Sequence, residues 1–71
     1  MRMLNDFAKN MKSTMVKKNM TYVALAKNSG LSVRKLHKIA SGEQADVKLS
    51  TAEKVAKGLG VSVVDLIKVH E

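Results

Sequence analysis

The chain has 71 residues, no cysteine and no tryptophan, and its 13 Lys and Arg against 6 Asp and Glu give a formal net charge of +7. This length allows one domain with a single modest core, and the missing cysteines exclude a disulfide framework and a thiolate zinc site. Because no apolar run approaches the ~20 residues of a membrane span and the N-terminus is too polar for a signal peptide, we expect a cytoplasmic protein without a membrane partner.

The first predicted helix spans residues 5–18. Its apolar side chains recur at intervals of three or four, which places them on one helix face: Leu4, Phe7, Met11 and Met15. Asn5 is the expected N-cap, and Asp6 in the first turn complements the helix dipole.

Four further helices are predicted from their starts, over residues 22–29, 33–40, 51–59 and 63–69. Three of them follow an apolar residue and a hydroxyl cap, in the pairs Met20-Thr21, Leu31-Ser32 and Val61-Ser62. Each cap oxygen satisfies a free backbone N–H, and each apolar residue fixes the direction in which the chain enters its helix. The remaining helix, 51–59, is expected to begin with a capping box formed by Ser50 and Glu53.

Glycines mark the predicted helix ends. Gly30, Gly42 and Gly60 each follow a periodic segment, where a helix C-terminus favours a left-handed residue. Residues 43–48 form the one substantial loop, and no segment alternates for long enough to predict a strand. The sequence therefore predicts an all-α fold, a compact bundle of four to five short helices that forms a single domain over residues 1–71.

The most informative segment runs from residue 21 to residue 42. Two short helices joined by so tight a turn can meet only at a large angle. Ala26 supplies a small contact, Gly30 the strained turn residue, and Leu31, Leu36 and Ile39 the buried apolar side. This arrangement is typical of the helix-turn-helix motif of DNA-binding proteins.

The second helix of this motif has an outward face suited to DNA. With Leu36 and Ile39 facing inward, four side chains project outward, namely Val33, Arg34, His37 and Lys38. Arginine can bind guanine O6 and N7 together, lysine can reach a guanine or a phosphate, and valine can pack on a thymine methyl group. A helix face rich in cations can also be an ordinary solvated surface. The surrounding motif decides between a DNA-binding face and a solvated one.

Several segments match a known pattern: Thr21-Tyr22-Val23-Ala24-Leu25-Ala26, Gly30-Leu31-Ser32, Leu36, Ile39, Ser41-Gly42 and Ala56-Lys57-Gly58-Leu59-Gly60-Val61-Ser62. In these segments the chain resembles the Cro-like and lambda-repressor-like phage regulators, over roughly residues 5–67. The resemblance implies a lambda-repressor-like DNA-binding domain that binds operator DNA, usually as a dimer. It also implies that Val33, Arg34, His37 and Lys38 occupy base-reading positions. Tyr22 departs from the pattern, because the family most often has glutamine there.

Phosphate contacts are expected around the helix N-termini, which present free N–H groups and the positive ends of helix dipoles. The expected set is Thr21, Tyr22, Ser32, Lys35, Ser41 and Lys48. For Thr21 and Ser32, capping alone explains the residue equally well. Tyr22 can alternatively cover the edge of the core with its ring.

The last predicted helix is the expected dimer interface. Its apolar side chains exceed what one small core can absorb: Val63, Val64, Ile67 and Val69. Packing of this helix into its own core is the alternative. A dimer presents two recognition helices about 34 Å apart to successive faces of the major groove, which predicts a palindromic operator.

The resulting hypothesis is a sequence-specific regulator of transcription, most simply a repressor that binds double-stranded DNA as a homodimer. The alternative is an antitoxin-type interaction module on the same fold, which neutralises a toxin and regulates its own promoter. No catalytic arrangement of Ser, His and Asp, no Gly-rich phosphate loop and no acidic cluster is present, so we expect neither an enzyme nor a cofactor, metal or small-molecule ligand. RNA binding is disfavoured by the shortage of stacking aromatics.

Overall fold

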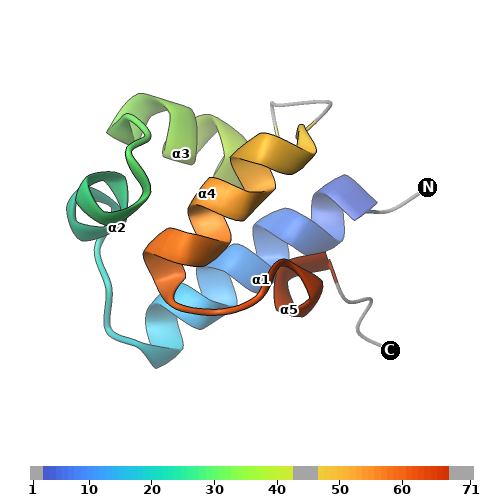
Figure 1. The fold of residues 1–71 in the computed structure, drawn as a ribbon, viewed down its shortest axis with the longest axis horizontal. Coiled ribbons are helices and arrows are strands. Elements are labelled where there is room, and N and C mark those ends of the chain that lie inside the picture. Colours follow the sequence, from blue (N-terminus) through green and yellow to red (C-terminus); the bar gives the residue numbers. More distant parts are fainter. Residues whose placement is uncertain (1–2, 43–46, 68–71) are drawn as a thin grey trace.

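The computed structural model describes the backbone of residues 3–42 and 47–67 and the side chains of residues 7–42 and 47–67. These residues form five α-helices and no strand (Figure 1). The helices are α1 (Met3–Lys17), α2 (Tyr22–Ser29), α3 (Val33–Ser41), α4 (Leu49–Leu59) and α5 (Val63–Ile67). The prediction of an all-α bundle of short helices is confirmed.

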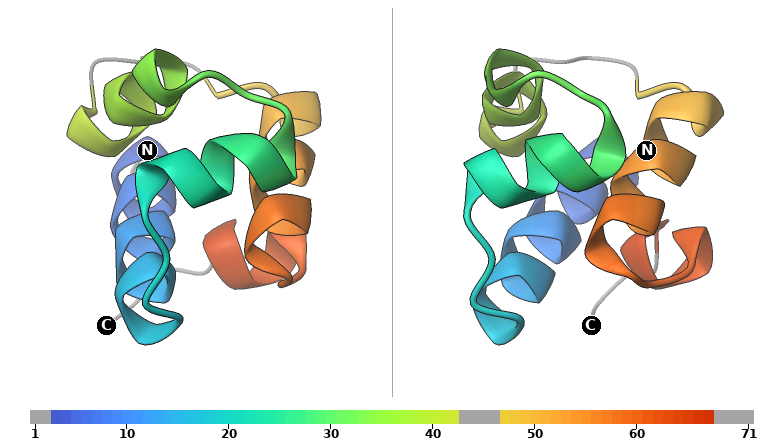
Figure 2. Two further views of the ribbon diagram at one scale, coloured as in Figure 1. Left: turned by 90° about the vertical axis from the view of Figure 1, so that its left-hand side faces the viewer. Right: turned by 60° about the vertical axis from the view of Figure 1, so that its left-hand side comes forward.

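The helices are arranged so that α3 and α5 lie at different ends of the molecule. Helix α2 packs against both α3 and α4, while α1 contacts α3, α4 and α5. Helices α3 and α5 do not contact each other, and the separation is visible in Figures 1 and 2. The surface formed by α3 is therefore spatially separate from the surface formed by α5.

The hydroxyl caps form as predicted. Thr21 Oγ1 accepts a hydrogen bond from the Ala24 N–H at 3.1 Å, and Ser32 Oγ accepts one from the Lys35 N–H at 3.1 Å. Before α5, the Asp65 N–H donates to Ser62 Oγ at 3.3 Å and the Ser62 N–H donates back to Asp65 Oδ2 at 3.4 Å. This reciprocal pair satisfies two N–H groups that the first turn of a helix leaves free.

Two predicted helix starts are wrong. Helix α4 begins at Leu49, with Lys48 as an N-cap that makes no side-chain cap bond, so Ser50 lies inside the first turn and forms no capping box. The exposed first turn can leave its N–H groups to water, and Val47 packs against the core and directs the chain into α4. Helix α1 begins at Met3, so the expected cap Asn5 lies within it.

The predicted helix ends are mostly confirmed. Gly30, Gly42 and Gly60 all have positive φ, at 79°, 83° and 76°. Helix α1 ends differently, through Asn19 at φ 54°, and the Met20 N–H donates to the Met15 carbonyl at 2.8 Å. Asparagine tolerates this left-handed conformation better than most residues, so it replaces the usual glycine. Helix α5 is described as far as Ile67, and the rest of the predicted segment to 69 lies outside the described residues.

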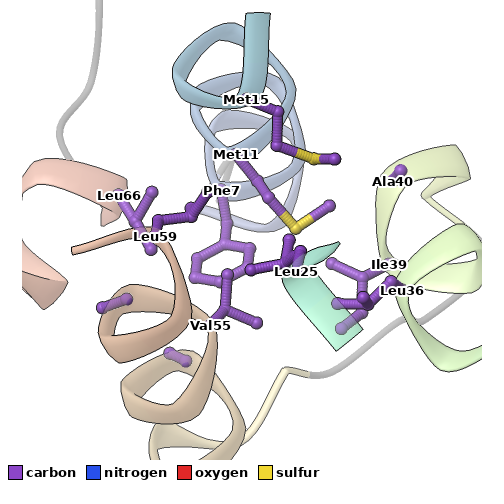
Figure 3. Packing of buried hydrophobic residues seen from close by; sticks show 12 residues of the cluster. Phe7, Met11, Met15, Leu25, Leu36, Ile39, Ala40, Val55, Leu59 and Leu66 are labelled. Carbon is purple, nitrogen blue, oxygen red and sulfur yellow. The ribbon is translucent and has the colours of Figure 1, made fainter. Parts of the chain in front are cut away.

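All five helices contribute to one apolar core, shown in Figure 3. Its largest fully buried side chains are Phe7 and Met11 from α1, Leu25 from α2, Leu36 and Ile39 from α3, Val55 and Leu59 from α4, and Leu66 from α5. Because the two motif helices bury their side chains against α1 and α4, they depend on the rest of the bundle for their geometry.

Helices α2 and α4 approach each other closely at Gly58. A Cβ atom at this position would lie 2.8 Å from Leu25 Cδ1 and 2.9 Å from Ser29 Cβ. Real Cβ atoms essentially never come so close to another heavy atom. Glycine therefore permits α2 to lie directly against α4. Ala26, the small residue predicted at the contact between the two motif helices, is half-buried and packs against the core.

A buried polar contact joins α1 to α5. Asn10 is 3% exposed, and its Nδ2 donates a hydrogen bond to the Leu66 carbonyl oxygen at 2.8 Å. This carbonyl belongs to the end of a short helix, where backbone acceptors have no partner within the helix. The bond fixes the position of α5 on α1, together with the burial of the Leu66 side chain.

We predict that Gly58→Val destabilises the fold by on the order of 2 kcal/mol, because the added methyl groups overlap Leu25 and Ser29. Urea unfolding followed by circular dichroism measures the effect. Lys57→Val is the matched control, since the neighbouring side chain is exposed and the change costs only roughly a few tenths of a kcal/mol in helix propensity. Equal losses in the two variants would contradict the close contact.

Candidate nucleic-acid interface

Helix α3 is held against the bundle by one face. Leu36 and Ile39 are fully buried, and Ala40 is 7% exposed. The bend from α2 into α3 is ordered locally, because the buried Ser29 hydroxyl accepts a hydrogen bond from the Leu31 N–H at 3.2 Å. Figure 2 shows α2 and α3 joined by this bend. The opposite face of α3 is left open to solvent.

That open face carries the four residues singled out from the sequence. Arg34, His37 and Lys38 are exposed, and Val33 is half-buried. The three exposed side chains line one shallow hollow together with Ser41. The structure thus brings a guanidinium, an imidazole and an ammonium group onto one surface of a single helix.

The first residue of α2 touches this surface. The Tyr22 ring lies against the His37 ring, with centroids 4.1 Å apart and an angle of 31° between the ring planes. Tyr22 is half-buried and also packs against the core. No pattern in the sequence indicates this contact, because the two residues belong to different helices.

The positive charge is concentrated in the first three helices. Residues 7–42 contain seven lysines and Arg34 but neither Asp nor Glu. All these cations are exposed except Lys35, which is half-buried. The whole-chain net charge conceals this distribution. Asp6 at the start of α1 is the one acidic residue in the three helices, so α1, α2 and α3 together carry a strongly positive potential.

A family model for Cro/C1-type HTH DNA-binding domains matches residues 10–71. The chain belongs to this family. The match includes the whole of α2 and α3 and confirms the resemblance inferred from the motif residues. It also establishes the protein as a DNA-binding regulator of the helix-turn-helix class. No curated protein and no solved structure matches the chain significantly.

In this Cro/C1-type domain, the residues expected to contact phosphate surround the ends of the motif helices. The Thr21 and Ser32 oxygens accept capping bonds, and both residues are exposed, so each hydroxyl hydrogen remains available to donate. Ser41 is exposed at the end of α3, and its Oγ donates to the Lys38 carbonyl at 3.1 Å. Lys48 is exposed but lies on a separate element, immediately before α4.

Lys12 is a further cation that the sequence interpretation missed at this surface. It lines an open groove between the C-terminal part of α1 and the start of α2, where Thr21 and Tyr22 also lie. Its place beside the α2 N-terminus follows from the packing of the bundle, so only the structure identifies it as a neighbour of the expected phosphate contacts.

The expected dimer residues occupy α5 in two different environments. Val63 is half-buried and packs against the core, whereas Val64 is 62% exposed and Ile67 is 37% exposed. Val69 lies outside the described residues. Helix α5 therefore divides its apolar side chains between the core of the Cro/C1-type domain and an outer surface.

The described residues contain no group of three or more His, Cys, Asp or Glu side chains placed to hold a metal ion. Among the helices that the structure describes, none combines the length and apolar character needed to cross a membrane.

We predict that Arg34→Ala removes the preference for one base pair and costs ~1–3 kcal/mol in binding free energy, because a bidentate arginine contact is lost. Titration of a selected duplex and of its single-base variants measures the change. Lys17→Ala removes the same charge from α1, beside Val61 and Asp65 and away from α3, and serves as the control. If Arg34→Ala weakened binding to all sequences alike, Arg34 would not read a base.

Proposed function

We propose that this protein is a transcriptional repressor that binds a palindromic operator as a homodimer, with α3 in the major groove. The observation that carries this proposal is the two-sided character of α3, with Leu36 and Ile39 buried and Arg34, His37 and Lys38 exposed. A helix anchored by one face can insert the other into DNA without rearranging the domain.

Base readout is assigned to Val33, Arg34, His37 and Lys38. Arg34 binds guanine O6 and N7, and Lys38 donates to a guanine acceptor or to a phosphate. His37 donates to a base edge or to a phosphate. The half-buried Val33 packs its exposed part on a thymine methyl group.

Phosphate contacts orient α3 in the groove. The proposed donors are Thr21, Tyr22, Ser32, Lys35, Ser41 and Lys48. Backbone N–H groups at the starts of α2 and α3 add to them, because the helix dipoles favour negative charge there. These contacts add affinity and fix orientation, while the base contacts provide specificity.

Dimerisation through α5 doubles both kinds of contact. The proposed interface comprises Val63, Val64, Ile67 and Val69. Since α5 does not touch α3, a partner on α5 leaves the DNA-binding face open. Two α3 helices about 34 Å apart then occupy successive major grooves, and the bound dimer excludes RNA polymerase from the promoter. The protein acts in the cytoplasm, and its function requires no catalysis, cofactor or small-molecule ligand.

We predict that affinity for a selected duplex falls steeply with salt. A monomer that neutralises about five phosphates gives a slope of log K against log salt of about −4.5, and a dimer gives about −9. Fluorescence-anisotropy titrations over a range of potassium chloride concentrations measure the slope. A flat response would indicate that the basic surface has a different partner.

We predict that Val64→Asp dissociates the dimer, raising its dissociation constant roughly tenfold or more, because a charge is placed in an apolar interface. Sedimentation equilibrium without DNA measures the constant. Leu49→Asp is the control: Leu49 is similarly exposed, at 67% against 62% for Val64, but it lies at the start of α4. A monomeric wild-type protein, or equal effects of the two changes, would contradict the assigned interface.

A further inference from the structure

The Tyr22 side chain connects the core of the protein to its DNA-binding face. Tyr22 is half-buried, packs against the core cluster and follows the cap residue Thr21 at the start of α2. Its ring also lies against the exposed His37 ring, with centroids 4.1 Å apart. A side chain held on the core by packing thus supports one that faces solvent.

Among the described residues, the other side chains around His37 do not hold its imidazole in place, so the contact with Tyr22 matters for its orientation. His37 shares its hollow with Arg34, Lys38 and Ser41, so its charged neighbours there are cations. No carboxylate is present between residues 7 and 42 to draw the imidazole to a fixed position. The Tyr22 ring packs against the His37 imidazole, and aromatic rings in such contact restrict each other's orientation.

We propose that Tyr22 is a specificity-determining positioning residue that acts through His37. The Tyr22 ring holds the imidazole over the hollow of α3, ready to donate a hydrogen bond to an acceptor on a base edge, such as purine N7 or thymine O4. The preference at that base pair then depends on a residue that does not touch the base. This inference rests on the proposed function of α3 and adds a role for the ring of Tyr22 to the phosphate contact proposed for its hydroxyl group.

The first test measures the contact without DNA. The chain has one Tyr, one Phe and no Trp, and Phe7 is buried in the core, so Tyr22 is the ring expected to shift the His37 ring protons in the NMR spectrum. His37→Ala assigns those signals. Tyr22→Leu retains apolar packing and removes the ring, so the His37 ring signals move downfield while Tyr22→Phe leaves them shifted upfield. Identical His37 signals in wild type and Tyr22→Leu would overturn the inference.

The second test measures specificity. A duplex is selected from a randomised 20-base-pair library with the wild-type protein, and binding to it and to its single-base variants is titrated. Tyr22→Leu is expected to lower discrimination at one base pair by about 2- to 10-fold, the effect of losing one aromatic contact, and His37→Ala is expected to relax the same base pair. In the double variant that combines Tyr22→Leu with His37→Ala, the loss of discrimination is smaller than the sum of the two single losses. Tyr22→Phe retains the preference even if loss of its hydroxyl weakens all sequences alike.

The outcomes separate this inference from the proposed function. If the wild-type protein selects no sequence, the proposed function fails, and the specificity role fails with it. If it selects a sequence but Tyr22→Leu weakens all variants equally, or its loss adds to that of His37→Ala, only the role of Tyr22 is overturned. Urea unfolding of each variant establishes that the titrations compare folded proteins.

Discussion

The close approach of α2 and α4 at Gly58 is the contact on which the rest of the structure depends. Because no side chain separates the two helices there, Leu25 reaches the core and Ser29 is buried at the end of α2. Ser29 in turn orders the bend at Gly30, and that bend directs α3 so that Leu36 and Ile39 are buried. The orientation of the exposed face of α3 therefore follows from packing on the far side of α2, since a helix of nine residues has little stability of its own.

The same packing separates two kinds of surface. The segment from residue 7 to residue 42, which includes most of α1 and all of α2 and α3, contains Lys and Arg but no Asp or Glu. Helix α5, which does not contact α3, exposes Val64 and Ile67. A charged surface attracts DNA from a distance and orients it, while an apolar surface is suited to a protein partner. In a domain of this size, such a separation would allow the proposed dimerisation and DNA binding to occur together.

Local signals in the sequence predicted much of the fold. The hydroxyl caps at Thr21 and Ser32 and the positive-φ glycines involve neighbouring residues, and the inward face of α3 follows from helical periodicity. The features that could not be predicted join distant segments, as in the bond between Asn10 and Leu66 or the ring contact between Tyr22 and His37. The predicted start of α4 is wrong because the sequence at Ser50 suits a capping box, whereas the helix begins at Leu49 without any side-chain cap bond. Within the candidate site, the exposed face of α3 could be predicted from the sequence. The position of Lys12 beside α2 and the contact of Tyr22 with His37 could not.

The exposed face of α3 is proposed to occupy the major groove of DNA. Methylation interference on a selected duplex tests it most directly, because dimethyl sulfate modifies guanine N7 in the major groove and adenine N3 in the minor groove. We expect methylation at guanine N7 to block binding at two symmetric half-sites one helical turn apart. Interference confined to adenine N3, or the absence of interference in both grooves, would contradict it.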